Sequence, residues 1–136
     1  TVATRLQADG YMDAESARRI RWLDAFGQLI ANTDRHLGNL SVFRTGAGRF
    51  ELAPAYDMLP MLFAPSGTVV VDRPFQPAPP SSQNLDVWNN AAEHAHQYWS
   101  RVIDCAELTP EFRARSRDCR DALDDLRERV PRSATA

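Results

Sequence analysis

Two carboxylates and one carboxamide stand in the first half of the chain at spacings that suit a metal-dependent site. Asp34 and Asn39 are five residues apart in the stretch TDRHLGN, and Asp57 follows eighteen residues after Asn39. Oxygen ligands of this kind favour Mg²⁺, which takes one or two protein carboxylates and leaves its other positions to water and substrate phosphates. If Asn39 and Asp57 hold the metal, Asp34 is free to accept a proton from a hydroxyl nucleophile. The residue types and spacings therefore indicate phosphoryl transfer.

A helix is expected immediately before this stretch. Asp13 is a suitable N-cap, and Glu15 places a carboxylate in the first turn, where it suits the helix dipole. Apolar residues then recur at steps of three and four, which predicts a helix over about residues 14–31 that ends at the polar cluster. Gly27 lies within this helix at a cost of up to about 1 kcal/mol against alanine, and it would permit close packing.

A β-hairpin is expected after the polar cluster. The segment LSVFRTGAGRFELAP predicts two short strands joined by a glycine-containing turn at Thr45–Gly48. The chain thus runs from a helix into the loop with Asp34 and Asn39, through the hairpin, and on to Asp57. A kinase catalytic loop presents the same order, with an Asp, an Asn five positions later and a metal-binding Asp further along.

The rest of the chain predicts a mainly α fold. Most of the nine prolines fall within residues 54–83, which reads as irregular, extended chain apart from a short strand over 69–71. Apolar residues at alternating steps of three and four predict a helix over about 85–105, beginning its apolar stripe at Leu85. In LTPEF, Thr109 is the expected N-cap and Pro110 the first residue of a final helix to about 130.

Several other polar or aromatic residues are expected to be structural. Trp88 and Trp99 lie on the apolar stripe of the helix predicted over about 85–105. This position favours a role in the core over a role as a base-stacking platform. His94 and His96 point about 200° apart on a helix and cannot share a metal there, so a helix surface is expected. The final helix carries interleaved arginines and aspartates opposite its apolar face, which favours a solvated face over a phosphate-binding patch.

Size and composition indicate one globular domain over residues 1–136, with 43% apolar and 25% charged residues and a net charge of -2. No apolar run has the length of a membrane span or a secretory signal. Two cysteines do not make a disulfide framework, so free thiols are expected at Cys105 and Cys119. All sixteen basic residues are arginine, which excludes any mechanism that needs a lysine from this chain.

The loop and the segment after the hairpin resemble the HipA family of bacterial serine/threonine kinases, the toxins of type II toxin–antitoxin systems. The resemblance rests on NTDRHLGNLSVF followed by FELAPAYDMLP. The family patterns T-D-x-H-x-x-N and L-x-P-x-Y-D are matched by Thr33, Asp34, His36, Asn39, Leu52, Pro54, Tyr56 and Asp57.

The resemblance implies a role for each matched residue. Asp34 would be the catalytic base, and Asn39 and Asp57 would bind Mg²⁺, with the ATP phosphates above them. The supporting residues would be Thr33, Arg35, His36 and Tyr56. The implied fold is a helical C-terminal kinase-like lobe with one small hairpin carrying the catalytic and metal-binding loop. The implied partners are ATP, a protein substrate with a Ser or Thr hydroxyl and an antitoxin that binds DNA, in the bacterial cytoplasm, with no membrane and no direct nucleic-acid binding.

The chain departs from the family pattern in what it lacks. It has no Gly-rich phosphate loop before the motif and no lysine to contact a phosphate. Unlike an ordinary protein-kinase loop, it places Arg35 and His36 after the Asp and not before it. We therefore expect a C-terminal fragment that lacks the nucleotide-covering N-terminal part and is inactive alone.

Other interpretations remain open at this stage. The rival functions are a small-molecule phosphotransferase of the kinase-like superfamily and a non-catalytic binding or regulatory module derived from a kinase. Asp34 and Asn39 could instead satisfy loop amides, as Asx residues often do. For His36 a hydrogen bond that fixes the loop is favoured over a proton carrier, and for Arg35 a plain surface charge is favoured over a phosphate contact.

Overall fold

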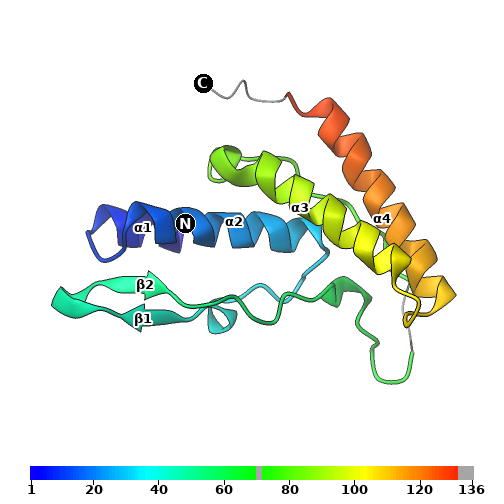
Figure 1. Cartoon of the computed structure of the whole chain (residues 1–136), viewed down its shortest axis with the longest axis horizontal. Helices are drawn as coiled ribbons and strands as arrows, with labels where there is room; N and C mark the ends of the chain where they lie inside the picture. Colours follow the sequence, from blue (N-terminus) through cyan, green and yellow to red (C-terminus); the bar gives the residue numbers. More distant parts are fainter. Residues whose placement is uncertain (70–71, 132–136) are drawn as a thin grey trace.

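The structure is a computed structural model that describes residues 1–69 and 72–131. Within these ranges the fold is mainly α with one small antiparallel sheet, which confirms the predicted fold class. The elements are α1 (Val2–Ala8), α2 (Ala14–Leu29), β1 (Val42–Arg44), β2 (Phe50–Leu52), α3 (Leu85–Asp104) and α4 (Pro110–Arg129). The hairpin and the irregular chain after it run alongside α1 and α2, while α3 packs between α2 and α4 (Figure 1).

Specific contacts and backbone conformations fix both ends of α2. Asp13 caps the start, as predicted, by accepting a hydrogen bond of 2.6 Å from the Ser16 amide. The helix ends at Leu29, two residues before the predicted end, because Ala31 adopts a left-handed conformation with φ of 61°. The indole Nε1 of Trp99 donates to the carbonyl of Leu29 at 3.0 Å, which satisfies a carbonyl in the last turn.

The main core lies between α2, α3 and α4. Trp88 and Trp99 are 2% and 0% exposed, which confirms their prediction as core residues. Each indole N–H is satisfied, since that of Trp88 donates to the Ala78 carbonyl in the proline-rich segment at 3.0 Å. Leu85 does not belong to this core and is 55% exposed, because it opens the first turn of α3, ahead of the buried stripe that starts at Val87.

Helix α1 is a short element that periodicity did not predict. It has only seven residues, too few for a helical pattern to repeat, although Thr1 caps it by accepting from the Thr4 amide at 3.2 Å. Its buried residue, Ala3, forms a second small core with Met12 and Ala17, against which Phe50 of the hairpin packs. This cluster joins the start of α2 to the hairpin.

The hairpin agrees with the prediction in position and turn. Val42 pairs with Leu52 and Arg44 pairs with Phe50. The connection contains a 3-10 turn over Gly46–Gly48, within the predicted turn. On the outer side of β2, the Phe50 amide donates to the Tyr11 carbonyl at 2.7 Å, which ties the hairpin to the chain between α1 and α2. The predicted strand over 69–71 lies partly outside the described residues.

Helix α4 follows its predicted pattern with one correction to its polar face. Thr109 accepts from the Phe112 amide at 3.2 Å, and Pro110 occupies the first turn. The polar face is less solvated than expected, because Asp124 lies 2.9 Å from Nδ1 of His96 on α3. His96 is therefore part of a helix–helix contact and not of a free surface. Both cysteines are free thiols, as predicted.

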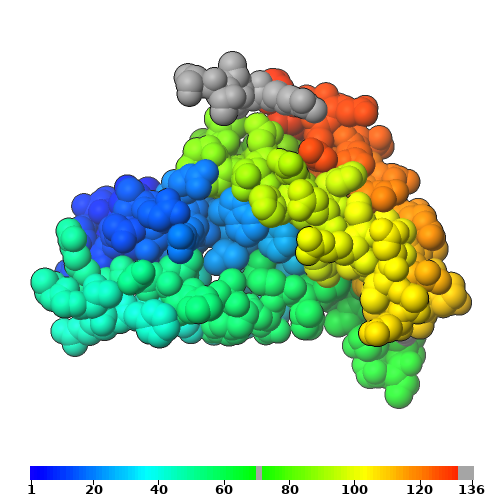
Figure 2. Space-filling view, in the orientation of Figure 1, coloured from blue at the N-terminus to red at the C-terminus, as the bar shows by residue number. Residues whose placement is uncertain are grey.

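No helix within residues 1–69 and 72–131 combines the length and the apolarity that a membrane crossing requires. Figure 2 shows the hairpin and the chain that follows it as a continuous strip along the blue helices α1 and α2. This strip and α2 are the elements that form the candidate site.

Candidate active site

The residues singled out from the sequence line one groove. Its volume is about 430 Å³, and its walls come from α2, the loop that follows it and the chain after β2. Residues 1–3 and the chain over residues 79–84 also contribute to its lining. Asp34, Asn39 and Asp57 all contribute to its lining, although residues 34 and 57 belong to segments separated by the whole hairpin. The supporting residues Arg35, His36 and Tyr56 also line it, whereas Thr33 does not.

The loop after α2 is shaped by an Asx turn. The buried side chain of Asn32 accepts a hydrogen bond of 3.0 Å from the Asp34 amide through Oδ1. The preceding residue, Ala31, is left-handed, and its carbonyl accepts from the Leu62 amide at 3.0 Å. The chain therefore leaves the helix sharply and presents the residues from Thr33 onward to solvent.

Asp34 and His36 form a pair at the surface of the groove. Nε2 of His36 lies 3.5 Å from Oδ1 of Asp34, and both side chains are about half exposed. Nδ1 of the same ring accepts a hydrogen bond of 3.0 Å from the Gly38 amide. In a neutral ring the proton must then sit on Nε2, facing the carboxylate. His36 thus shapes the turn and orients Asp34, in agreement with the favoured structural interpretation of this histidine.

Asn39 is held by its amide nitrogen, which leaves its oxygen available. Nδ2 donates to the Asp34 carbonyl at 3.0 Å across the short 3-10 turn Leu37–Asn39. Oδ1 makes no hydrogen bond to any residue that the structure describes. The five-residue spacing therefore brings Asn39 back against Asp34 with an oxygen free for a hard cation.

Asp57 reaches the same groove from the segment that follows β2. Its backbone is left-handed, with φ of 58°, a conformation that Asp tolerates better than most residues. Its carbonyl accepts from Nδ2 of Asn32 at 3.3 Å. Its carboxylate forms no ion pair or hydrogen bond within the described ranges and is exposed. Asp57 is thus fixed through its backbone and free at its side chain.

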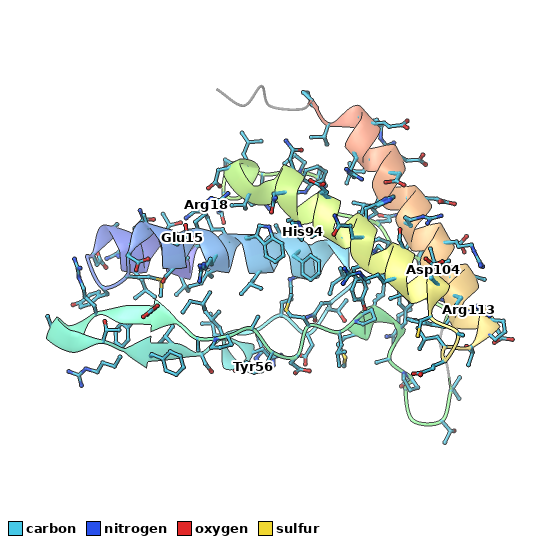
Figure 3. All side chains as sticks on the ribbon, viewed as in Figure 1. Glu15, Arg18, Tyr56, His94, Asp104 and Arg113 are labelled. Atoms are coloured by element: carbon cyan, nitrogen blue, oxygen red, sulfur yellow. The ribbon has the colours of Figure 1, made fainter. Side chains whose placement is uncertain are left out.

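Tyr56 makes a second link between the two segments. Its hydroxyl donates to the Gly38 carbonyl at 2.8 Å and lies 3.1 Å from the Ser41 hydroxyl. The ring stands on the irregular chain after β2, where that chain passes along α2 (Figure 3). The residue before Asp57 therefore contacts the loop that contains Asp34 and Asn39.

Arg35 is directed back toward α2. Its Nε lies 3.2 Å from the carboxylate of Asp24, and its NH1 contacts the carbonyl of Asn32. A Cβ placed on Gly27 would lie 2.7 Å from Cδ of Arg35, so the absence of a side chain at residue 27 admits this arginine. Arg35 therefore forms an ion pair with α2 and is not the plain surface charge favoured from the sequence, and the close packing expected at Gly27 is confirmed.

The donor set fits a cation that needs few protein ligands. No group of three or more His, Cys, Asp or Glu side chains that could hold a metal occurs within residues 1–69 and 72–131. Asn39 Oδ1 and the Asp57 carboxylate are both without hydrogen-bond partners in that part of the chain. One carboxylate and one amide oxygen suit Mg²⁺, which completes its octahedron with water and phosphate oxygens.

Sequence reasoning missed the central residue of this arrangement, Asn32. In the sequence Asn32 is only one member of a polar cluster, whereas in the structure it is 2% exposed and contacts both halves of the site. A signal was present, since an Asx residue two positions before another polar residue often accepts from that residue's amide. Its second contact, with Asp57, joins residues 25 apart and has no local signal.

The fold and the site together define a class of protein. It is a mainly helical domain in which an Asp-x4-Asn loop and a later Asp line one groove. The chain belongs to the family of HipA-like C-terminal domains, whose family model matches residues 2–134. It is similar to Toxin YjjJ of Escherichia coli (strain K12), with 35% identity over 109 residues, which cover 79% of this chain and 24% of that relative. The chain thus spans about a quarter of the relative's length. No solved structure matches it.

Proposed function

We propose that this chain is the C-terminal portion of a serine/threonine protein kinase, which transfers the γ-phosphoryl group of ATP to a protein hydroxyl. The observation that carries the proposal is the convergence of Asp34, Asn39 and Asp57 on one groove. Family membership adds to it, because the family model matches residues 2–134, which include all three.

Each residue would act through a group that its surroundings leave available. Asp34 would accept the proton of the substrate hydroxyl, with His36 orienting its carboxylate from 3.5 Å. Oδ1 of Asn39 and the carboxylate of Asp57 would hold Mg²⁺. The ion, when bound, would neutralise charge on the phosphate oxygens. Positioning and electrostatic stabilisation supply most of the catalysis in phosphoryl transfer, which needs little covalent participation from the protein.

The whole protein's activity needs residues beyond these 136. A Gly-rich phosphate loop and a lysine are both missing from the sequence, and the relative is about four times as long as the matched region. We propose that the phosphates of ATP are covered by an N-terminal part and that the isolated chain is inactive. The protein would act as a toxin, as its relative's name suggests, and would have a DNA-binding antitoxin partner in the bacterial cytoplasm.

The test is a phosphoryl-transfer assay on the full-length protein that contains this chain. Labelled ATP and Mg²⁺ would be supplied with bacterial extract proteins, and wild type compared with Asp34→Asn and Asp57→Asn. Loss of the general base lowers rates by about 10²- to 10⁴-fold, so labelling by Asp34→Asn should fall within that range. Asp125→Asn, which changes an exposed carboxylate on α4, is the matched control and should label like wild type.

Three results would contradict the proposal. Labelling that survives both Asp34→Asn and Asp57→Asn would exclude the assigned roles. Transfer to aminoglycosides or sugars in place of protein would favour the small-molecule phosphotransferase. The complete absence of ATP-dependent transfer in the wild type would favour a non-catalytic module.

A further inference from the structure

One buried amide side chain lies between the two halves of the candidate site. Asn32 is 2% exposed, although the six residues that follow it are all exposed. Burying an amide without hydrogen bonds is unfavourable, so a buried Asn side chain needs polar partners inside the protein. The burial of Asn32 therefore differs from the exposure of the loop that follows it and needs its own explanation.

Both ends of the Asn32 side chain are used, and each contacts a different segment. Oδ1 accepts from the Asp34 amide at 3.0 Å, and Nδ2 donates to the Asp57 carbonyl at 3.3 Å. These are the backbone groups of the proposed base and of the proposed metal ligand themselves. One planar carboxamide thus sets the separation of the two residues that must act on the same phosphoryl group.

The backbone of Asn32 is held as firmly as its side chain. Its amide donates to the Gly27 carbonyl at 2.9 Å, and its carbonyl accepts from the Arg35 guanidinium. On either side of the link, Ala31 and Asp57 are left-handed, with φ of 61° and 58°. Non-glycine residues keep this conformation only where surrounding contacts fix it. Asn32 lies at the point where both left-handed turns are joined.

We propose that Asn32 is a positioning residue that keeps the loop with the base and the segment with the metal ligand in one arrangement. The inference rests on the proposed function, since it assigns Asn32 a task in that reaction. Residues that hold a metal ligand or a catalytic group in place through hydrogen bonds change metal affinity or activity by about 10- to 100-fold when removed. We expect Asn32→Ala to lower kcat by a factor in that range and to raise the Mg²⁺ concentration needed for half-maximal rate.

Two substitutions separate the two contacts. Asn32→Ala removes both hydrogen bonds. Asn32→Asp is nearly isosteric and keeps an acceptor for the Asp34 amide, but it cannot donate to the Asp57 carbonyl. Asn90→Ala is the matched control, because it removes an Asn that accepts from Trp22 at 2.8 Å, between α2 and α3 and outside the groove.

The first measurement is amide hydrogen exchange on the full-length protein, which requires no activity. Two peptides report on the link, one covering residues 33–40 and one covering 57–63, where the Leu62 amide bonds to Ala31. We expect faster exchange in both peptides for Asn32→Ala, and in the second peptide alone for Asn32→Asp. Peptides from α4 should be unchanged in both variants, and Asn90→Ala should leave both reporter peptides as in wild type.

The second measurement is the Mg²⁺ dependence of transfer for the same proteins, normalised to folded protein. A purely structural role would lower the yield of folded protein without shifting the Mg²⁺ midpoint. The inference is overturned if Asn32→Ala speeds exchange only in residues 33–40, or if its kcat and Mg²⁺ midpoint equal those of wild type. A wild type that is inactive while the exchange pattern holds would refute the proposed function and, with it, the task assigned to Asn32, leaving only a mechanical link.

Discussion

At the scale of single residues, the candidate site is built by side chains that fix the backbone around the proposed reactive groups. Asn32 and Tyr56 bond to backbone carbonyls, and His36 accepts from a backbone amide. The Asp57 carboxylate forms no hydrogen bond or ion pair among the described residues. Such a division is expected of a site whose reactive groups must remain available to a ligand.

A substitution at Gly27 would test whether the close contact between α2 and Arg35 of the loop is needed for activity. Alanine at residue 27 should gain up to about 1 kcal/mol of helix propensity, but its Cβ would meet Cδ of Arg35 at 2.7 Å. We expect Gly27→Ala to displace Arg35 from Asp24 and to lower transfer activity several-fold, with the unfolding free energy within about 1 kcal/mol of wild type. Urea unfolding and the transfer assay measure the two effects.

The control for this substitution is Gly46→Ala in the hairpin turn, where nothing lies within 4 Å of an added Cβ. It should leave the activity as in wild type. A Gly27→Ala protein that gains the full helix propensity and keeps its activity would show that the position of Arg35 is unimportant.

The two cysteines should differ sharply in reactivity. Burial raises the pKa of the Cys119 thiol to about 12, from an ordinary value of 9.0. At pH 8 this lowers the thiolate fraction by about a thousandfold, and the thiolate is the reactive form. We expect iodoacetamide to modify Cys105 and to spare Cys119 in the folded protein, as read by peptide mass spectrometry. Both should react in urea, and equal labelling of the native protein would contradict the packing of α4.

The same raised pKa has a consequence for stability at high pH. Because the folded pKa of Cys119 exceeds the unfolded one, its contribution is complete below pH 9 and is lost as the pH rises toward 12. Cys119→Ala should therefore be less sensitive to alkali over this interval than wild type. Urea midpoints between pH 8 and pH 11 provide the comparison.

At the scale of elements, α3 helps to fix the end of α2. The Trp99 indole lies against the last turn of α2 and donates to the Leu29 carbonyl at 3.0 Å, immediately before the loop of the site begins. The loop therefore starts from a helix end that is fixed by the core and not by local sequence alone.

Trp99→Phe should weaken this junction. The substitution leaves the buried Leu29 carbonyl without its donor, which costs about 1–3 kcal/mol, and removes part of a large side chain. We expect a fall in the unfolding free energy of at least that size, measured by urea titration. Trp22→Phe is the control, because its indole bonds to exposed Asn90, and its loss should be smaller. Equal losses would contradict the special position of Trp99.

Some elements of the molecule could be predicted from the sequence and others could not. Helices α2, α3 and α4 and the hairpin follow from repeating apolar spacing, N-caps such as Asp13 and Thr109, and glycines in a turn. The seven-residue helix α1 has no repeat to detect. The link from Asn32 to Asp57 joins residues 25 apart and depends on tertiary packing. The sequence could therefore name residues that line the groove, but it could not identify the contacts that hold their segments together.

At the scale of the whole molecule, α2 is the element common to both cores. It carries Arg21, whose guanidinium lies 2.8 Å from the carboxylate of Asp86 in the first turn of α3. The hydrogen bond from Arg21 is the main cause that lowers the pKa of Asp86 below its usual value of 3.8. The arginine is largely buried, and the contact links the middle of α2 to the first turn of α3.

Acid should weaken this contact. Since the folded pKa of Asp86 lies below the unfolded one, its contribution is present above pH 3.8 and is lost as the pH falls through the folded value. Asp86 is half exposed, so we expect the pair to contribute under about 1 kcal/mol at neutral pH. The difference in urea midpoint between wild type and Asp86→Asn should shrink from pH 7 to pH 3. A constant difference would show that charge is not its source.

We propose that one groove holds a base, Asp34, and two metal ligands, Asn39 and Asp57, and that these residues have separate tasks. The most direct measurement is the rate of transfer by the full-length protein as a function of Mg²⁺ concentration, for wild type, Asp34→Asn and Asp57→Asn. We expect Asp57→Asn to need more Mg²⁺ for half-maximal rate, because a charged ligand is lost. Asp34→Asn should have a lower maximal rate at an unchanged midpoint. If the curves of both variants coincide with the wild-type curve, Asp34 and Asp57 do not have these roles.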